Sequence, residues 1–168
     1  LRARLPGLQV LVQGEGTRHS LMERFRQGSA QGAPGCVLVA SVSFWEGVDV
    51  PGDALQLVVI DKLPFPVPSD PLVQAHAQRL RRAGRSPFRD HALPEAAVAL
   101  KQGAGRLLRH ETDEGLLVVA DTRLLDRGYG KRLMAALPTK RRLGSAEEFD
   151  DALQALITRT STMDRSCP

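Results

Sequence analysis

Two arginines and a glutamine are spaced so that they could act together from one side of a helix. Gln102, Arg106 and Arg109 occur at positions i, i+4 and i+7, and at about 100° per residue they fall within roughly 60° of one another. Two arginines and an amide would therefore project together from a packed helix. The alternative interpretation is a solvated polar face, since charged helix faces are common.

The segment that must position these side chains is a predicted helix over residues 95–109. Gly103 and Gly105 each weaken a helix interior by about 1 kcal/mol relative to alanine. We therefore expect something to approach this backbone more closely than a Cβ atom would allow. The opposite side of the helix is an apolar stripe typical of core packing: Ala97, Leu100, Ala104, Leu107 and Leu108.

Short apolar runs with helices between them indicate an α/β fold with a mainly parallel sheet. CVLVA is a run of the kind found in strands buried on both faces. Between the first two runs, Thr17 can cap a helix that carries Leu21, Met22 and Phe25 inward. Asp121 to Arg123 follows the last run, at the strand end where open α/β sheets bind ligands. The four runs are 8–13, 36–40, 56–61 and 115–120.

The segments between and after these strands have distinct patterns. Residues 41–54 are too rich in Gly, Pro and Asp for a regular helix and indicate a loop. Residues 63–71 hold four prolines and predict a stiff, extended connector. A helical pattern over 71–83 becomes basic toward its end, and for these arginines we favour a helix end stabilised by its dipole over a phosphate contact. They are Arg79, Arg81, Arg82 and Arg85.

Two further helices are predicted in the last third of the chain. The first covers residues 129–137 and stops at Pro138. Ser145 and Glu148 have the spacing of a capping box for the second. One face of that helix carries apolar side chains, namely Phe149, Leu153, Leu156 and Ile157. We expect a disordered tail over 160–168.

Composition narrows the class of protein. The chain has 168 residues, 42% hydrophobic and 25% charged, which indicates one soluble globular domain over residues 1–159. The charge of +4 and pI near 9.6 permit an anionic partner. Cys36 and Cys167 are far apart and the four histidines are scattered, so we expect neither disulfides nor a metal site. No apolar run of about 20 residues is present, and we expect a cytoplasmic protein without membrane contact.

Two motifs in order resemble motifs V and VI of superfamily 2 helicases. They are SFWEGVDVPG over 43–52 and QGAGRLLR over 102–109, followed by the Asp121-x-Arg123 strand end. The phrases IDKLPFPVPSDP and DTRLLDRGYGKRLMAALP resemble the DinG branch of XPD-like DNA helicases more narrowly, so the similarity runs over residues 8–138. It implies a RecA-like, P-loop-NTPase-type domain, the second of two motor domains, incomplete on its N-terminal side.

The resemblance also implies roles for particular residues. ATP and Mg²⁺ would bind between two motor domains, with the Walker motifs and a four-cysteine iron–sulfur cluster on the absent first domain. Arg106 and Arg109 would be the arginine fingers, and Gln102 would orient the γ-phosphate or attacking water. The residues expected near the nucleotide are Glu46, Gly47, Asp49 and Gly105, with Glu46 and Asp49 linking it to a DNA-facing loop.

DNA is the partner that this resemblance implies, as a single strand or a forked duplex. Ser41 and Ser43 are candidates for phosphate contacts. For Phe44 and Trp45 we favour packing beneath the loop over base stacking.

Three functions stay open on the sequence. The first is the C-terminal half of an ATP-driven DNA helicase, inactive as this fragment alone. The second is a non-catalytic nucleic-acid-binding or interaction module that kept the helicase fold. The third, an unrelated Rossmann-like nucleotide binder, is disfavoured because the sequence holds neither a G-x-x-x-x-G-K-[ST] loop nor a strand followed by G-x-G-x-x-G.

Overall fold

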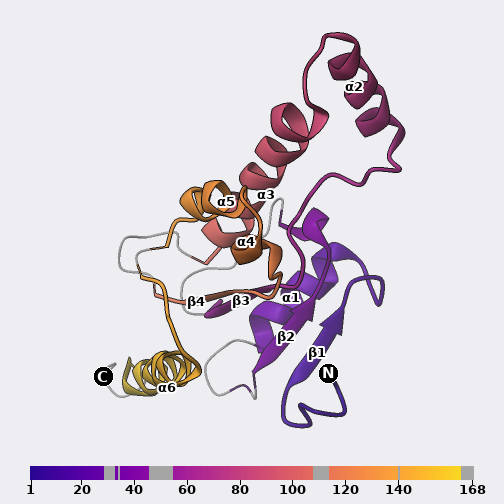
Figure 1. Cartoon of the computed structure of the whole chain (residues 1–168). Coiled ribbons are helices and arrows are strands. Elements are labelled where there is room, and N and C mark those ends of the chain that lie inside the picture. Colours follow the sequence, from indigo (N-terminus) through magenta and orange to yellow (C-terminus); the bar gives the residue numbers. More distant parts are fainter. Residues whose placement is uncertain (29–32, 34, 46–54, 108–113, 140, 164–168) are drawn as a thin grey trace. The chain divides into compact units, whose positions relative to one another are not determined.

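The structure is a computed structural model that describes residues 1–28, 33, 35–45, 55–107, 114–139 and 141–163 (Figure 1). It divides into two compact units, whereas chain length alone predicts one domain. The first comprises Leu1–Leu57, Arg106–Leu116 and Arg141–Pro168, and the second comprises Val58–Gly105 and Leu117–Lys140.

The first unit is built on a parallel strand pair covered by one helix (Figure 1). Strand β1 (Gln9–Val12) pairs with β2 (Cys36–Val39), with Gln9 opposite Cys36. Helix α1 (Arg18–Gly28) connects them. The predicted cap is confirmed, because the Ser20 N–H donates to Thr17 Oγ1 at 3.2 Å. The core unites the strands, α1 and the 3-10 turn η1 (Val42–Phe44) through Leu11, Leu21, Met22, Phe25 and Phe44.

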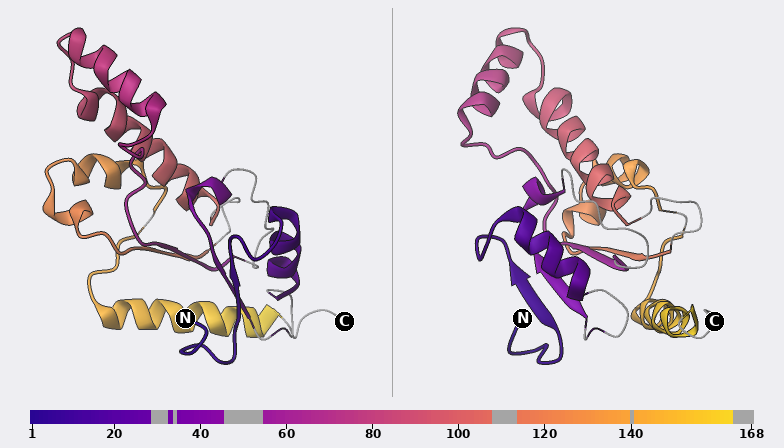
Figure 2. Two further views of the ribbon diagram at one scale, coloured as in Figure 1. Left: turned by 90° about the vertical axis from the view of Figure 1, so that its right-hand side faces the viewer. Right: turned by 180° about the vertical axis from the view of Figure 1, so that it is seen from behind.

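The first unit also contains the last helix, α6 (Ala146–Met163), which Figure 2 shows along its length. The Ser145 cap is confirmed: the Glu148 N–H donates to Ser145 Oγ at 3.2 Å, while Glu148 Oε2 accepts from the Gly144 N–H at 2.6 Å. The helix continues past Thr160, where the sequence analysis begins a disordered tail. No Gly or Pro interrupts residues 146–163, so nothing in the sequence stops the helix there.

The second unit contains most of another strand pair, β3 (Leu57–Ile60) and β4 (Leu116–Val119). The Leu116 N–H donates to Gln56 O and the Ala120 N–H donates to Ile60 O, both at 2.9 Å. The residue numbers on both strands increase together from the first hydrogen bond to the second, so β3 and β4 are parallel. The described chain therefore has two parallel pairs where the sequence predicts one mainly parallel sheet. The expected burial on both strand faces is wrong for Val39 and Val59, which are 38% and 58% exposed.

Helices make up the rest of the second unit. The prolines of the connector lead into α2 (Pro71–Arg82), where the Asp70 carboxylate accepts from the Leu72 N–H at 2.8 Å. The chain then reverses into the π-helical segment η3 (Phe88–Ala92) and α3 (Leu93–Gly105), as Figure 2 shows. After β4 come α4 (Arg123–Asp126) and α5 (Gly130–Ala136). Leu100 and Leu133 are both fully buried here.

Candidate functional site

Helix α3 ends before the arginines that the sequence analysis places on it. Its last residue is Gly105, and Arg106 and Leu107 form a turn. The predicted helix therefore ends one residue before Arg106, where two glycines lower the helix propensity, and the shared side of Gln102 and Arg106 stays a prediction. Gln102 is exposed on α3 and Arg106 is half-buried. Arg109 lies outside the described residues.

The apolar side of α3 packs largely as predicted. Leu100 and Ala104 on α3 and Leu107 in the turn after it are 0%, 2% and 6% exposed, whereas Ala97 is only half-buried and Leu108 lies outside the described residues. Gly105 differs from this buried side, because apart from its chain neighbours and the backbone of α3 itself no atom of the described chain lies within 4 Å of the position that a Cβ atom would take. The close approach expected there does not come from the described chain, and the backbone at Gly105 is open.

Ser41 and Ser43 lie together just after β2. Their Oγ atoms are 2.8 Å apart and both residues are exposed. The Ser41 N–H donates to Gln13 Oε1 at 2.7 Å. Since Gln13 follows the parallel partner β1, the carboxyl ends of both strands are joined at this point. Each hydroxyl has one hydrogen to donate, so while the two serines are bonded to each other one of these hydrogens is left for an anionic oxygen.

Phe44, directly after Ser43, belongs to the core. It is 6% exposed, which confirms packing as the role of its ring. Arg18 Nη2 donates to Phe44 O at 3.3 Å, and its guanidinium carbon lies 5.4 Å from the ring centroid. Sequence reasoning missed Gln13, which lies 28 residues from Ser41, and Arg18, which lies 26 residues from Phe44. Both residues hold the turn that contains the two serines. Glu46, Gly47 and Asp49 lie outside the described residues.

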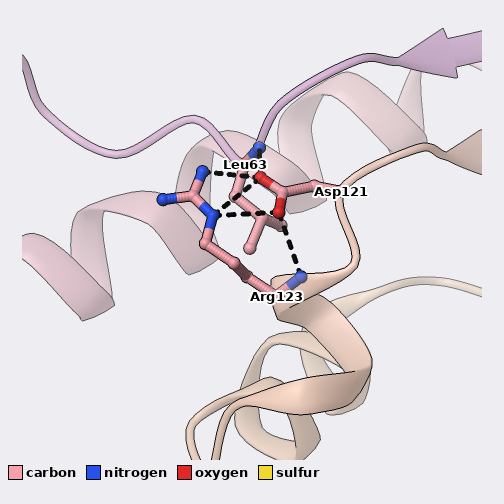
Figure 3. Close-up of polar contacts among 3 residues, drawn as sticks. All are labelled: Leu63, Asp121 and Arg123. Atoms are coloured by element: carbon pink, nitrogen blue, oxygen red, sulfur yellow. Dashed lines mark hydrogen bonds and ion pairs between the residues drawn. The ribbon is translucent and has the colours of Figure 1, made fainter.

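The carboxyl ends of β3 and β4 are joined by the predicted Asp121-x-Arg123 motif (Figure 3). Asp121 Oδ2 accepts from the Leu63 N–H at 2.9 Å and from Arg123 Nη2 at 2.6 Å. Asp121 Oδ1 accepts from the Arg123 N–H at 3.1 Å and from its Nε at 2.9 Å. The Arg123 hydrogen bonds, opposed by desolvation and helped by the Leu63 N–H, hold the pKa of the Asp121 carboxyl well below its usual range.

The carboxylate of Asp121 accepts its hydrogen bonds from groups of the same chain. Its side chain is 7% exposed, whereas that of Arg123 is 45% exposed. The carboxylate therefore fixes the start of the proline-rich connector to the end of β4. Both carboxylate oxygens of Asp121 accept hydrogen bonds from the chain itself, so neither is free for the ligand that we expected at this strand end.

An aromatic cluster that the sequence analysis missed lies beside the motif. Phe65, Phe88 and Tyr129 approach one another with ring centroids 5.2–5.7 Å apart. The Arg123 guanidinium lies 5.7 Å from the Phe65 ring centroid. These residues come from three separate segments, and no periodicity in the sequence connects them.

A protein-family model described as a helicase C-terminal domain matches residues 1–140. The chain belongs to this family. The helicase resemblance drawn from motifs V and VI is thereby confirmed. No helix in the described part of this helicase C-terminal domain is long and apolar enough to cross a membrane. Its described residues also contain no group of three or more His, Cys, Asp or Glu that could hold a metal ion.

Curated relatives of this helicase C-terminal domain agree with the DinG branch. ATP-dependent DNA helicase YoaA of Haemophilus influenzae is 47% identical over 147 residues, covering 88% of this chain and 22% of that protein. ATP-dependent DNA helicase DinG of Photobacterium profundum is 41% identical, covering 80% and 19%. The 3'-5' exonuclease DinG of Bacillus subtilis is 39% identical, covering 90% and 16%. The chain spans about a fifth of the length of these relatives.

Proposed function

We propose that this chain is the C-terminal motor half of an ATP-dependent DNA helicase. The full-length protein would couple ATP hydrolysis to translocation on single-stranded DNA and to unwinding of forked duplexes, in the cytoplasm. The observation that carries the proposal is the QGAGRLLR motif at the end of α3, in a helicase C-terminal domain whose relatives include ATP-dependent DNA helicases. The parallel strand pairs joined by helices support a RecA-like fold.

The proposed nucleotide side of the domain starts at Gln102. Its exposed side chain would orient the γ-phosphate or attacking water, and Arg106 and Arg109 would stabilise charge on the transferring oxygens. The open backbone at Gly105 fits this role, because a bound phosphate could approach without meeting a side chain. Gly47 would bring backbone near the nucleotide, with Glu46 and Asp49 linking it to the DNA-facing loop. When bound, Mg²⁺ would neutralise phosphate charge from the first motor domain, where an iron–sulfur cluster is also expected.

On the DNA side, Ser41 and Ser43 are the proposed phosphate contacts. Their exposed hydroxyl groups hydrogen-bond to each other at 2.8 Å after a parallel strand, so one hydroxyl hydrogen is left to donate to an anionic oxygen, and both could donate once that bond opens. Such contacts read the backbone rather than base sequence, so binding should not depend on sequence, and its salt dependence should come from the modest basic excess of the chain.

The test is steady-state ATP turnover by the full-length protein with and without single-stranded DNA. We expect DNA-stimulated turnover, and a loss of about 10³-fold or more in kcat for Arg109→Ala. Arg109→Lys should restore little, since a point charge does not reproduce the planar fork. Arg141→Ala removes an exposed arginine of the first unit and is the matched control. Retention of full activity by Arg109→Ala would refute the finger assignment.

The 168-residue chain alone should hydrolyse no ATP, because it would supply fingers without the phosphate-binding loop. Turnover by the purified chain that Arg109→Ala abolishes would contradict a shared site. The second candidate is a nucleic-acid-binding module that kept the fold without a motor. One observation supports a domain without a motor role, namely that the Bacillus subtilis relative carries the name of an exonuclease and not of a helicase. Absence of DNA-stimulated ATP turnover in the full-length wild type, with DNA binding intact, would decide for it.

A further inference from the structure

The turn between α2 and η3, together with the helix ends on both sides, has a net charge of +4, which equals the net charge of the whole chain. We call residues 79–90 the arginine tip. It holds five of the 23 basic side chains and one of the 19 acidic ones, so the remainder of the +4 chain is balanced. All five arginines are exposed: Arg79, Arg81, Arg82, Arg85 and Arg89.

The backbone of the arginine tip is held by local hydrogen bonds at the end of α2. The Arg85 N–H donates to Leu80 O at 2.9 Å and the Gly84 N–H donates to Arg81 O at 3.0 Å. Gly84 has a φ of +68°, which glycine adopts without steric cost. This is the Schellman pattern of helix termination, and it fixes where Arg85 leaves the helix.

The second half of the arginine tip is held equally by side chains. The Ser86 N–H donates to Asp90 Oδ2 at 3.0 Å, and the Arg89 N–H donates to Ser86 Oγ at 3.3 Å. The rings of His76 on α2 and His91 on η3 lie 4.2 Å apart between centroids. The arginines are therefore presented on an ordered turn, which lowers the entropy lost when they bind a partner.

Within the described part of the chain, the arginine tip is poor in counter-ions. Arg85 pairs with Asp90 at 3.4 Å, and the other four arginines make no ion pair among the described residues. Arg79 and Arg82 are three residues apart on α2, so their like charges repel. The helix dipole favours positive charge in the last turn, but it does not require four arginines without partners. Intrachain stability thus explains only part of this charge.

An exposed aromatic ring accompanies the arginines. Phe88 is 41% exposed and lies in the tip beside Arg89, while its ring is supported by Phe65 and Tyr129. It begins η3, a π-helical segment of a kind that is rare and frequent at functional sites. Arginines that track a phosphate backbone, beside an aromatic ring that stacks on bases, are the usual elements of single-strand binding sites.

We propose that the arginine tip binds single-stranded DNA, with its arginines on the phosphates and Phe88 against a base. This proposal depends on the proposed function in one respect, which is that DNA is the substrate. The contact is separate from the Ser41 and Ser43 site and lies wholly within the second unit.

The test compares DNA binding by full-length wild-type protein and Arg79→Gln/Arg82→Gln. Glutamine preserves helix propensity. Each phosphate contact on a single strand contributes about 0.7 to the slope of log K against log salt. The double variant should therefore reduce the slope by about 1.4 and weaken binding of a fluorescent oligothymidine by roughly 25-fold near 0.1 M salt. Arg79→Lys/Arg82→Lys should retain the slope.

The matched control is Arg141→Gln/Arg142→Gln, which removes the same charge from exposed positions outside the arginine tip and should leave the slope unchanged. If the first double variant does not fold, Arg81→Gln/Arg89→Gln gives the same readout. An unchanged slope, a slope change equal to the control's, or an effect on blunt duplex only would overturn the proposal. DNA-stimulated ATP turnover by the wild type is scored independently, so the proposed function and this contact can fail separately.

Discussion

Replacing Asp121 by asparagine tests whether its carboxylate joins the proline-rich connector to β4. An asparagine keeps one acceptor oxygen, so either the Leu63 or the Arg123 N–H would face an amide NH₂ group. An N–H left without an acceptor in a part-buried site costs about 1–3 kcal/mol. The lost ion pair adds little, because solvent screens the Arg123 side chain, which is 45% exposed. We expect the free energy of unfolding at pH 7 to fall by about 1–3 kcal/mol in urea titrations of the chain.

The pH dependence of that loss follows from the depressed pKa of Asp121. The folded chain favours the ionised carboxylate, so the stabilisation is complete above the ordinary aspartate pKa of about 3.9 and declines as the pH falls further. The gap between wild type and Asp121→Asn should therefore narrow below about pH 4. Arg123→Gln is the control, because it keeps the carboxylate that accepts from both backbone N–H groups and should cost less than Asp121→Asn. Equal stability of Asp121→Asn and wild type at pH 7, or a gap that is constant between pH 3 and 7, would refute the reasoning.

Other substitutions address packing and capping, each measured by urea or thermal unfolding of the chain. Leu107→Ala should lower the free energy of unfolding by about 2–5 kcal/mol, since this side chain is 6% exposed, and a loss below 1 kcal/mol would contradict its core role. Gly130→Ala should unfold or severely destabilise the chain, because the added Cβ would overlap the Leu124 backbone oxygen, whereas Gly128→Ala meets nothing and serves as control. Asp70→Ala should cost about 0.5–2 kcal/mol through the lost α2 cap, and Asp70→Asn should restore most of it.

Local signals in the sequence were sufficient for most elements. The Thr17 and Ser145 caps are confirmed because their hydrogen bonds reach only three residues along the chain. The four apolar runs became strands within one or two residues of the predicted bounds. Such features depend on residues that are close in sequence, so the residue types alone are enough to predict them.

Contacts between distant segments could not be predicted in the same way. Leu63 and Asp121 are 58 residues apart, and their hydrogen bond depends on β3 and β4 being paired. The same holds for Gln13 and Ser41, which meet because β1 and β2 are parallel neighbours. The proposed roles of Arg106 and Arg109 come from motif text, since no local pattern distinguishes them from a solvated face.

Gly105 at the end of α3 lowers helix propensity and also has a proposed role in binding the nucleotide. The variant Gly105→Ala tests these two effects separately. The position has room for a Cβ atom, and its φ is not in the left-handed region. Alanine should therefore stabilise the chain by about 0.4–1 kcal/mol, both by favouring the helix and by restricting the unfolded state. If a phosphate approaches this backbone in the full-length protein, the same methyl group should lower DNA-stimulated ATP turnover while stability rises. Measured together, a stability gain with unchanged turnover would show that nothing approaches Gly105 closely. A stability loss would show instead that the glycine is required by the fold, and the open space at its Cβ position would then have no functional meaning.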